Sequence, residues 1–94
     1  MTRYAKRRDI SEPGIVATLK AIGCDVERGN DCDLFVRCPK GHGYLLECKT
    51  PGPDAKHRQP IQKRLAEIFG DQYHVVTNSK EALQAIGYYS ETIL

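Results

Sequence analysis

The sequence predicts an α/β domain, more closely an α+β fold in which helices cover a mixed β-sheet. Residues 31–50 have the pattern of two strands joined by the turn-forming segment Pro-Lys-Gly-His-Gly, which predicts a hairpin. Residues 60–69 have helical periodicity, and residues 73–77 are rich in strand-forming side chains. A hairpin followed by a helical crossover gives a sheet with both antiparallel and parallel neighbours.

The length and composition are those of one small globular domain. The chain has 94 residues, of which 28% are charged and 40% hydrophobic, and such a chain buries one sheet and a few helices. No apolar run reaches the roughly 20 residues that a membrane span needs, and no signal peptide is visible. We therefore expect a cytoplasmic protein without a membrane partner.

The net charge of +2 is unevenly distributed along the chain. Residues 1–8 contain no acid and four bases, so we treat them as a basic arm that precedes a single domain over residues 9–94. The four bases are Arg3, Lys6, Arg7 and Arg8. Such an arm suits contact with an anionic polymer, although a solvated chain end explains the same charges.

A helix is expected first, over residues 9–22. Its apolar residues recur at helical spacing: Ile15, Val16, Leu19 and Ile22. Ser11 is the expected N-cap, Pro13 is tolerated in a first turn, and Gly23 supplies the stop. A short strand over residues 24–28 should follow.

The hairpin comes next, after a tight turn at Gly29 and Asn30. If its own turn centres near Gly41, the numbers of paired residues sum to about 82, to within one or two. Asp33 then lies beside Lys49 and diagonal to Glu47. Two carboxylates and an ammonium meet at the open end of the hairpin, and this is the candidate active site.

The last third of the chain is expected to be loop, helix, strand and helix. The loop after the hairpin offers three phosphate contacts: Lys56, His57 and Arg58. The helix over residues 60–69 ends at Gly70, and the strand over residues 73–77 follows it. Asn78 or Ser79 caps a third helix through Ile86, which Gly87 ends. Apolar residues in the tail after Gly87 could pack on a partner subunit.

The cysteines and histidines do not have the close spacing of a zinc site. Cys32, Cys38 and Cys48 fall at strand positions that alternate with the candidate site face. We expect them to be small buried hydrophobic residues in a reducing compartment.

Asp33 and Glu47 could hold one hard divalent cation, because Mg²⁺ is bound through one or two carboxylates plus water and phosphate oxygens. Such a cation acidifies its bound water and stabilises the leaving oxygen. Lys49 could position the attacking water or stabilise charge in the transition state. A cross-strand salt bridge between Lys49 and an acid is the alternative that the residues leave open.

The pattern of an acid, a strand and turn, and then Glu-x-Lys resembles the PD-(D/E)XK nuclease superfamily. Asp33 matches the first acid and residues 47–49 match the (D/E)XK triplet, while Cys32 stands where the family usually has proline. Gln62 at a helix start and residues 74–83 resemble the VRR-NUC branch, the virus-type replication-repair nucleases, whose small standalone members are typical of phages and bacteria. The resemblance implies a restriction-endonuclease-like core with the order αβββαβα.

The resemblance also implies roles for individual residues. Asp33 and Glu47 would be metal ligands together with the backbone carbonyl of Cys48, and Lys49 would be the catalytic lysine. Gln62 would lie next to the site, and Glu12 corresponds to an acidic position that often approaches the metal. Two further residues are assigned more generally: Asp31 as a backup metal contact or a turn acid, and Lys63 as a DNA contact.

The function that the resemblance implies is a Mg²⁺- or Mn²⁺-dependent DNA endonuclease acting on branched DNA. Standalone members of this branch resemble Holliday junction resolvases, which cut a four-way junction symmetrically as homodimers. This chain is too small for two sites, so the resemblance implies a homodimer. Phosphate contacts from the arm and loop would position the DNA without reading its sequence. A flap, nicking or exonuclease activity is the first alternative, and a catalytically silent DNA-binding module is the second.

Overall fold

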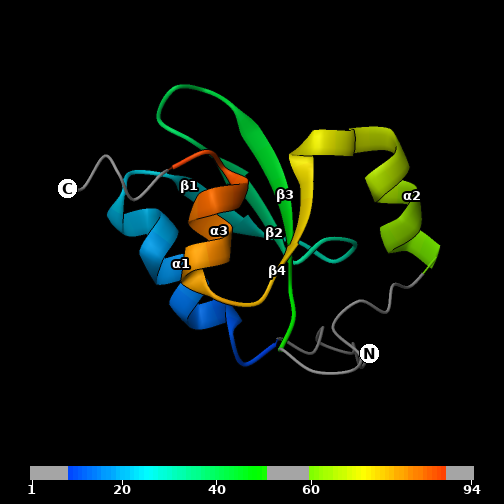
Figure 1. Cartoon of the computed structure of the whole chain (residues 1–94), viewed down its shortest axis with the longest axis horizontal. Helices are drawn as coiled ribbons and strands as arrows, with labels where there is room; N and C mark the ends of the chain where they lie inside the picture. Colours follow the sequence, from blue (N-terminus) through cyan, green and yellow to red (C-terminus); the bar gives the residue numbers. More distant parts are fainter. Residues whose placement is uncertain (1–8, 51–59, 89–94) are drawn as a thin grey trace, which may run out of the picture.

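The computed structural model describes residues 9–50 and 60–88, which form a four-stranded mixed sheet with helices on both faces (Figure 1). The helices are α1 (Glu12–Ala21), α2 (Pro60–Phe69) and α3 (Ser79–Ala85), with a 3₁₀ turn, η1 (Gly70–Gln72), after α2. The strands are β1 (Asp25–Arg28), β2 (Leu34–Arg37), β3 (Gly43–Cys48) and β4 (Tyr73–Val76), in this order across the sheet. The predicted α+β class and order of elements are confirmed.

The sheet is mixed because a hairpin is followed by a helical crossover, as predicted from the sequence. Consecutive pairs from β1 to β3 are antiparallel, whereas β4 returns after the α2 crossover and pairs parallel to β3. Figure 1 shows α1 and α3 together on one side of the sheet and α2 on the other. The sheet therefore separates two apolar layers.

The larger core lies between the sheet and α1 and α3. It contains Leu19 from α1, Leu34 from β2, Leu46 from β3 and Ala82 from α3, all with no exposed surface. The smaller core lies toward α2, where Leu65 and Ala66 pack on a buried group: Cys32, Leu45 and Tyr73.

The start of α1 differs from the expected capping. Pro13 lies in the first turn as predicted, and Gly23 follows the helix with φ +94°, a conformation that favours glycine. The Ser11 side chain does not cap the helix. Its N–H and hydroxyl donate instead to Asp9 Oδ1, at 3.0 and 2.7 Å. Asp9, two residues before the serine, therefore holds the chain at this helix start.

The hairpin register differs by two residues from the expected one. Leu34 faces Leu46, so the next pair places Asp33 opposite Glu47 rather than Lys49. The cause is a turn centred one residue earlier than expected: Cys38 N–H donates to His42 O, and Gly41 N–H donates to Cys38 O. Because the shift is even, each side chain keeps its predicted face.

The segment before β2 is also different from the prediction. The tight turn expected at Gly29 and Asn30 is a longer bend that includes Asp33, so that β2 begins only at Leu34. Gly29 N–H donates to Asp33 O at 3.1 Å and closes this bend. A β-carbon on Gly29 would lie 2.2 Å from Cε2 of the exposed Phe35 ring and 2.8 Å from the backbone oxygen of Cys32, so this bend leaves little room for a larger residue.

The C-terminal elements match their predictions to within one residue. Asn78 caps α3 by accepting a hydrogen bond from Glu81 N–H at 2.8 Å. The Glu81 carboxylate accepts in turn from the N–H of Thr77, the residue before the cap, at 2.7 Å. The expected apolar tail lies outside the described residues except for Tyr88, which is exposed.

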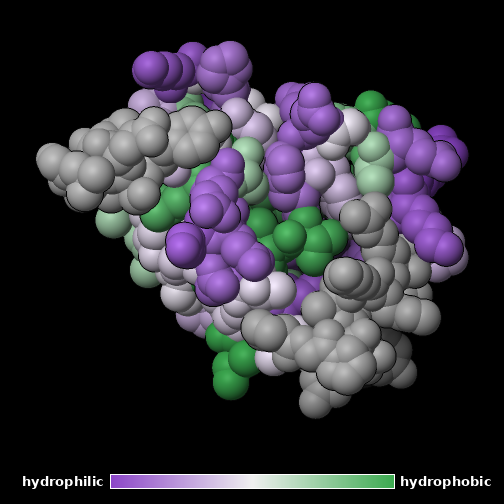
Figure 2. Space-filling model, in the orientation of Figure 1, coloured by the Kyte–Doolittle hydropathy of each residue, from purple (hydrophilic) through white to green (hydrophobic). Residues whose placement is uncertain are grey.

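β4 is an edge strand of the sheet. Figure 2 shows hydrophobic surface in the middle of the view, where Figure 1 draws β4, with polar side chains on both sides. Across the described residues, no helix combines the length and the hydropathy needed to traverse a lipid bilayer.

Candidate active site

Four polar side chains are buried among the described residues, and each comes from a different part of the fold. Glu12 belongs to α1, Asp33 to the bend before β2, Glu47 to β3 and Gln62 to α2. Their exposed fractions are 1, 5, 1 and 8%. Burying a carboxylate is costly unless it is paired or bound to a metal ion. All four residues are among those that the sequence analysis selected.

Asp33 is held by the backbone of the neighbouring strand. β3 continues beyond the start of β2, and the N–H of Cys48 donates to Asp33 Oδ2 at 2.8 Å. The aspartate side chain thus occupies the position where a strand backbone would otherwise accept this hydrogen bond. The same contact turns its carboxylate toward the end of β3.

Glu12 reaches this place from the first residue of α1. Arg28 Nε donates to Glu12 Oε2 at 2.7 Å, and this ion pair holds the glutamate from β1. Carboxylate oxygens of Glu12 and Asp33 and the sulfur of Cys48 lie within 4.8 Å of one another, and all three residues are buried. The structure therefore brings together two carboxylates from segments far apart in the sequence.

The pKa of the Cys48 thiol reflects the negative charges around it. Burial raises the pKa of this thiol, and the carboxylates of Asp33, Glu12, Asp9 and Glu47 raise it further. A hard divalent cation prefers oxygen to sulfur ligands. The four carboxylates produce a negative potential that suits a divalent cation with oxygen ligands. The role of the Cys48 carbonyl stays a prediction.

Asp9 is a contributor that the sequence reasoning missed. Its carboxylate accepts hydrogen bonds from Thr50 N–H at 2.9 Å and from the Thr50 hydroxyl at 3.0 Å, in addition to those from Ser11. It thereby ties the start of α1 to the residue after Lys49. Burial raises the pKa of Asp9, but the hydrogen bonds outweigh it and hold the pKa below its usual value. The Asp-x-Ser pattern signals the local turn, whereas nothing local indicates Thr50.

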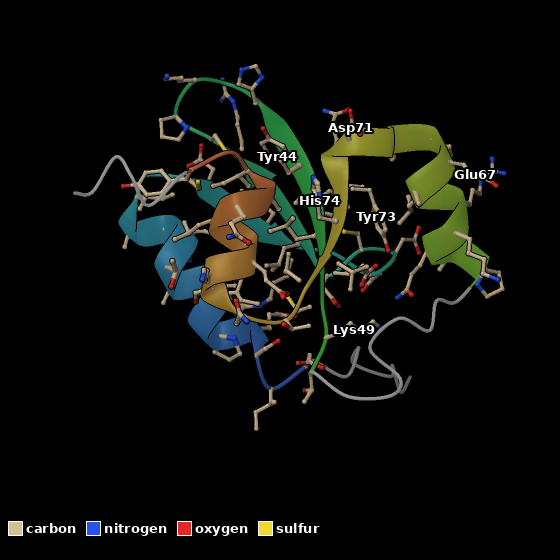
Figure 3. All side chains as sticks on the ribbon, viewed as in Figure 1. Tyr44, Lys49, Glu67, Asp71, Tyr73 and His74 are labelled. Atoms are coloured by element: carbon tan, nitrogen blue, oxygen red, sulfur yellow. The ribbon has the colours of Figure 1, made fainter. Side chains whose placement is uncertain are left out.

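Glu47, Lys49 and Gln62 belong to the α2 side of the sheet. Glu47 and Lys49 share that face because side chains alternate along a strand. Lys49 is half-buried where β3 leaves the sheet, and its N–H donates to Val76 O at 2.9 Å (Figure 3). Gln62 is the only buried residue of α2.

Glu47, which was predicted as a metal ligand, is not a member of the group of Glu12, Asp33 and Cys48, and the remaining selected residues are not members either. Asp31 is exposed in the bend before β2, which favours the turn acid over the metal contact. Lys63 is exposed on α2, and its role as a DNA contact stays a prediction. The other expected DNA contacts lie outside the described residues: Arg3, Lys6, Arg7, Arg8, Lys56, His57 and Arg58.

Comparison with known proteins adds no relative: the chain matches no family model, no curated protein and no solved structure.

Proposed function

We propose that this chain is a Mg²⁺- or Mn²⁺-dependent endodeoxyribonuclease that acts on branched DNA in the cytoplasm of a bacterium or a phage-infected cell. The observation that carries the proposal is the buried group of Glu12, Asp33 and Cys48, whose donor atoms lie within 4.8 Å of one another. Glu47 and Lys49 adjoin it at the end of β3. A structural ion pair at a sheet edge has no need of several carboxylates in a buried position.

The residues divide the chemistry among them. Asp33, Glu47 and Glu12 would hold the cation, which when bound acidifies water and stabilises negative charge on phosphate oxygens. Lys49, on the more open side of β3, would orient the attacking water and stabilise charge on the phosphate in the transition state. Gln62 would orient either the water or Lys49 from α2. Arg28 and Asp9 act indirectly, because they hold Glu12 and the end of β3.

The substrate and assembly follow from the same proposal. A four-way junction offers two symmetric cleavage positions, and residues 9–50 and 60–88 of one chain supply one group of clustered carboxylates. A homodimer with twofold symmetry would supply two. Phosphate contacts through Lys63 and the basic segments outside the described residues would hold branched DNA without base-specific readout.

The test is cleavage of an end-labelled four-way junction in the presence of Mg²⁺ or Mn²⁺. Linear duplex, flap and single-stranded DNA of the same sequence serve as controls, and Lys49→Ala serves as the blank. Paired symmetric cuts in the junction alone are expected. Cutting only at flaps or ends would support the metal site but contradict the four-way junction as the substrate. The absence of all cutting would favour a silent DNA-binding module.

A matched pair of variants separates the metal site from general charge effects. Asp71 is an exposed acid just before β4, at the end of the sheet opposite Lys49 (Figure 3). Asp71→Asn should cut like the unmodified chain, whereas Asp33→Asn should not cut. Equal loss in both variants would contradict the assignment of Asp33.

A further inference from the structure

Two cysteines face each other at the other end of the sheet. Cys24 precedes β1 and Cys38 follows β2. Asp25 pairs with Arg37 in the antiparallel ladder, so the next pair outward is Cys24 and Cys38. Their sulfur atoms lie 4.0 Å apart. The juxtaposition is set by the register of the two strands.

The backbone hydrogen bonds show which kind of antiparallel pair this is. Gly29 N–H donates to Asp33 O, and because hydrogen-bonded and non-hydrogen-bonded pairs alternate, Cys24 and Cys38 form a non-hydrogen-bonded pair. Their own N–H groups donate away from each other, to Leu19 O and His42 O. Cα atoms in such pairs lie about 4.5 Å apart, within the range of roughly 4.4–6.8 Å that a disulfide spans. A disulfide therefore fits this pair without movement of the strands.

The two thiols differ in access. Cys24 is buried, whereas Cys38 is partly exposed. Both line a cavity of about 490 Å³ that is open to solvent, together with Lys40 and His42. Burial raises the pKa of Cys24 to about 11, and the neighbouring Cys38 and Asp25 add to the shift. The thiolate is the reactive form, so Cys38 should react first and Cys24 second.

We propose that Cys24 and Cys38 are a redox-active pair that forms a reversible disulfide by exchange with a small-molecule disulfide such as oxidised glutathione. The Cys38 thiolate attacks one sulfur of the oxidant, giving a mixed disulfide and one glutathione thiol. Cys24 then loses its proton and attacks the Cys38 sulfur, releasing the second glutathione thiol. The protein loses two protons and two electrons, and the oxidant gains them.

The disulfide would join an edge strand to the interior of the sheet. β1 pairs only with β2 among the described strands. The disulfide would link these two strands covalently at one end of their antiparallel pairing. Cys48 and the carboxylates lie where β3 ends, whereas Cys38 lies beside the turn where β3 begins. The proposal therefore goes beyond the nuclease assignment and does not depend on it.

The experiment is disulfide mapping of the whole chain after exposure to oxidised glutathione. Each cysteine lies on its own tryptic peptide, and Cys24 and Cys38 lie on residues 21–28 and 38–40. We expect these two peptides to be linked after alkylation and non-reducing digestion, and to separate after treatment with dithiothreitol. Four singly alkylated peptides after oxidation, or a link that includes Cys32 or Cys48, would overturn the proposal.

Single variants test the order of the two steps. Cys24→Ser should stop at the mixed disulfide, so that peptide 38–40 carries one glutathione. Cys38→Ser should leave the buried Cys24 unmodified. Glutathione on Cys24 in the Cys38→Ser chain would contradict the assigned order. A urea titration of the unmodified chain gives a readout that needs no variant: oxidation should raise the midpoint and dithiothreitol should reverse the change, and an unchanged midpoint would contradict a bond between the strands.

Discussion

Replacement of Asp33 by asparagine should stabilise the metal-free protein while it removes the metal site. Asparagine keeps an oxygen that can accept the hydrogen bond from Cys48 N–H, which the aspartate accepts at 2.8 Å. What is lost is a negative charge within 4.8 Å of the Glu12 carboxylate. At that separation and an effective dielectric constant of about 20, two like charges repel by roughly 3.5 kcal/mol.

Two effects make the expected stabilisation smaller than this repulsion energy between the two carboxylates. Arg28 already neutralises part of the Glu12 charge through its 2.7 Å contact, and a hydrogen bond to a neutral acceptor is weaker than one to a carboxylate by about 1 kcal/mol. We therefore expect Asp33→Asn to raise the free energy of unfolding by about 1–2 kcal/mol without metal. Adding Mg²⁺ at a hundredfold excess over its dissociation constant should stabilise the unmodified chain by about 2.7 kcal/mol, and the variant should not respond.

Urea denaturation followed by circular dichroism, with and without Mg²⁺, measures both effects. Asp31→Asn is the matched control, because Asp31 is an exposed acid two residues earlier and lies outside the cluster. Its unfolding should resemble that of the unmodified chain and should keep the Mg²⁺ response. The reasoning would be refuted if the Asp33→Asn chain without metal were less stable than the unmodified chain. It would also be refuted if Mg²⁺ stabilised the variant as much as it stabilises the unmodified chain.

Four further predictions concern the same region. Lys49→Ala should lower the cleavage rate by orders of magnitude and keep the Mg²⁺-dependent stabilisation; loss of both would make the lysine structural. Cys48→Ser should cut nearly as fast as the unmodified chain, since the site is assigned to oxygen ligands, and an inactive variant would indicate a sulfur ligand. The depressed pKa of Asp9 means that its ionised form stabilises the fold above its ordinary pKa of 3.8, and this stability is lost as the pH falls through the lower folded pKa. Urea midpoints measured down to about pH 2 should show this loss in the unmodified chain and not in Asp9→Asn. The affinity for a junction should fall steeply with salt concentration in a gel-shift assay, because binding releases counterions from the DNA. An affinity that does not change with salt would contradict the predicted phosphate contacts.

The hairpin and the helices were predictable because each depends on residues that lie a few positions apart in the sequence. Alternation and turn residues indicated the hairpin, helical periodicity indicated α1 and α2, and a cap at Asn78 or Ser79 indicated the start of α3. The register lies at the edge of the expected range, two residues from its centre, because the turn geometry depends on which carbonyl oxygens accept from Cys38 N–H and Gly41 N–H. Residue types alone do not specify that choice.

The candidate site was predictable only in part. Asp33, Glu47 and Gln62 were selected by spacing and resemblance, and the structure buries all three. The contacts that hold the site come from segments remote in the sequence, as with Arg28 on Glu12 across 16 positions and Thr50 on Asp9 across 41. Such pairs have no periodicity or fixed spacing that a sequence reading could detect.

The sequence alone determined the α+β class, the order of the elements and the acids and lysine at the end of the hairpin. These follow from alternation, helical periodicity and turn chemistry, which act between residues a few positions apart. Only the tertiary structure decided that Glu12 reaches Asp33 and that Cys24 faces Cys38. Both depend on how α1 packs and on which residues pair across the strands, because side-chain proximity is set by strand register and helix packing.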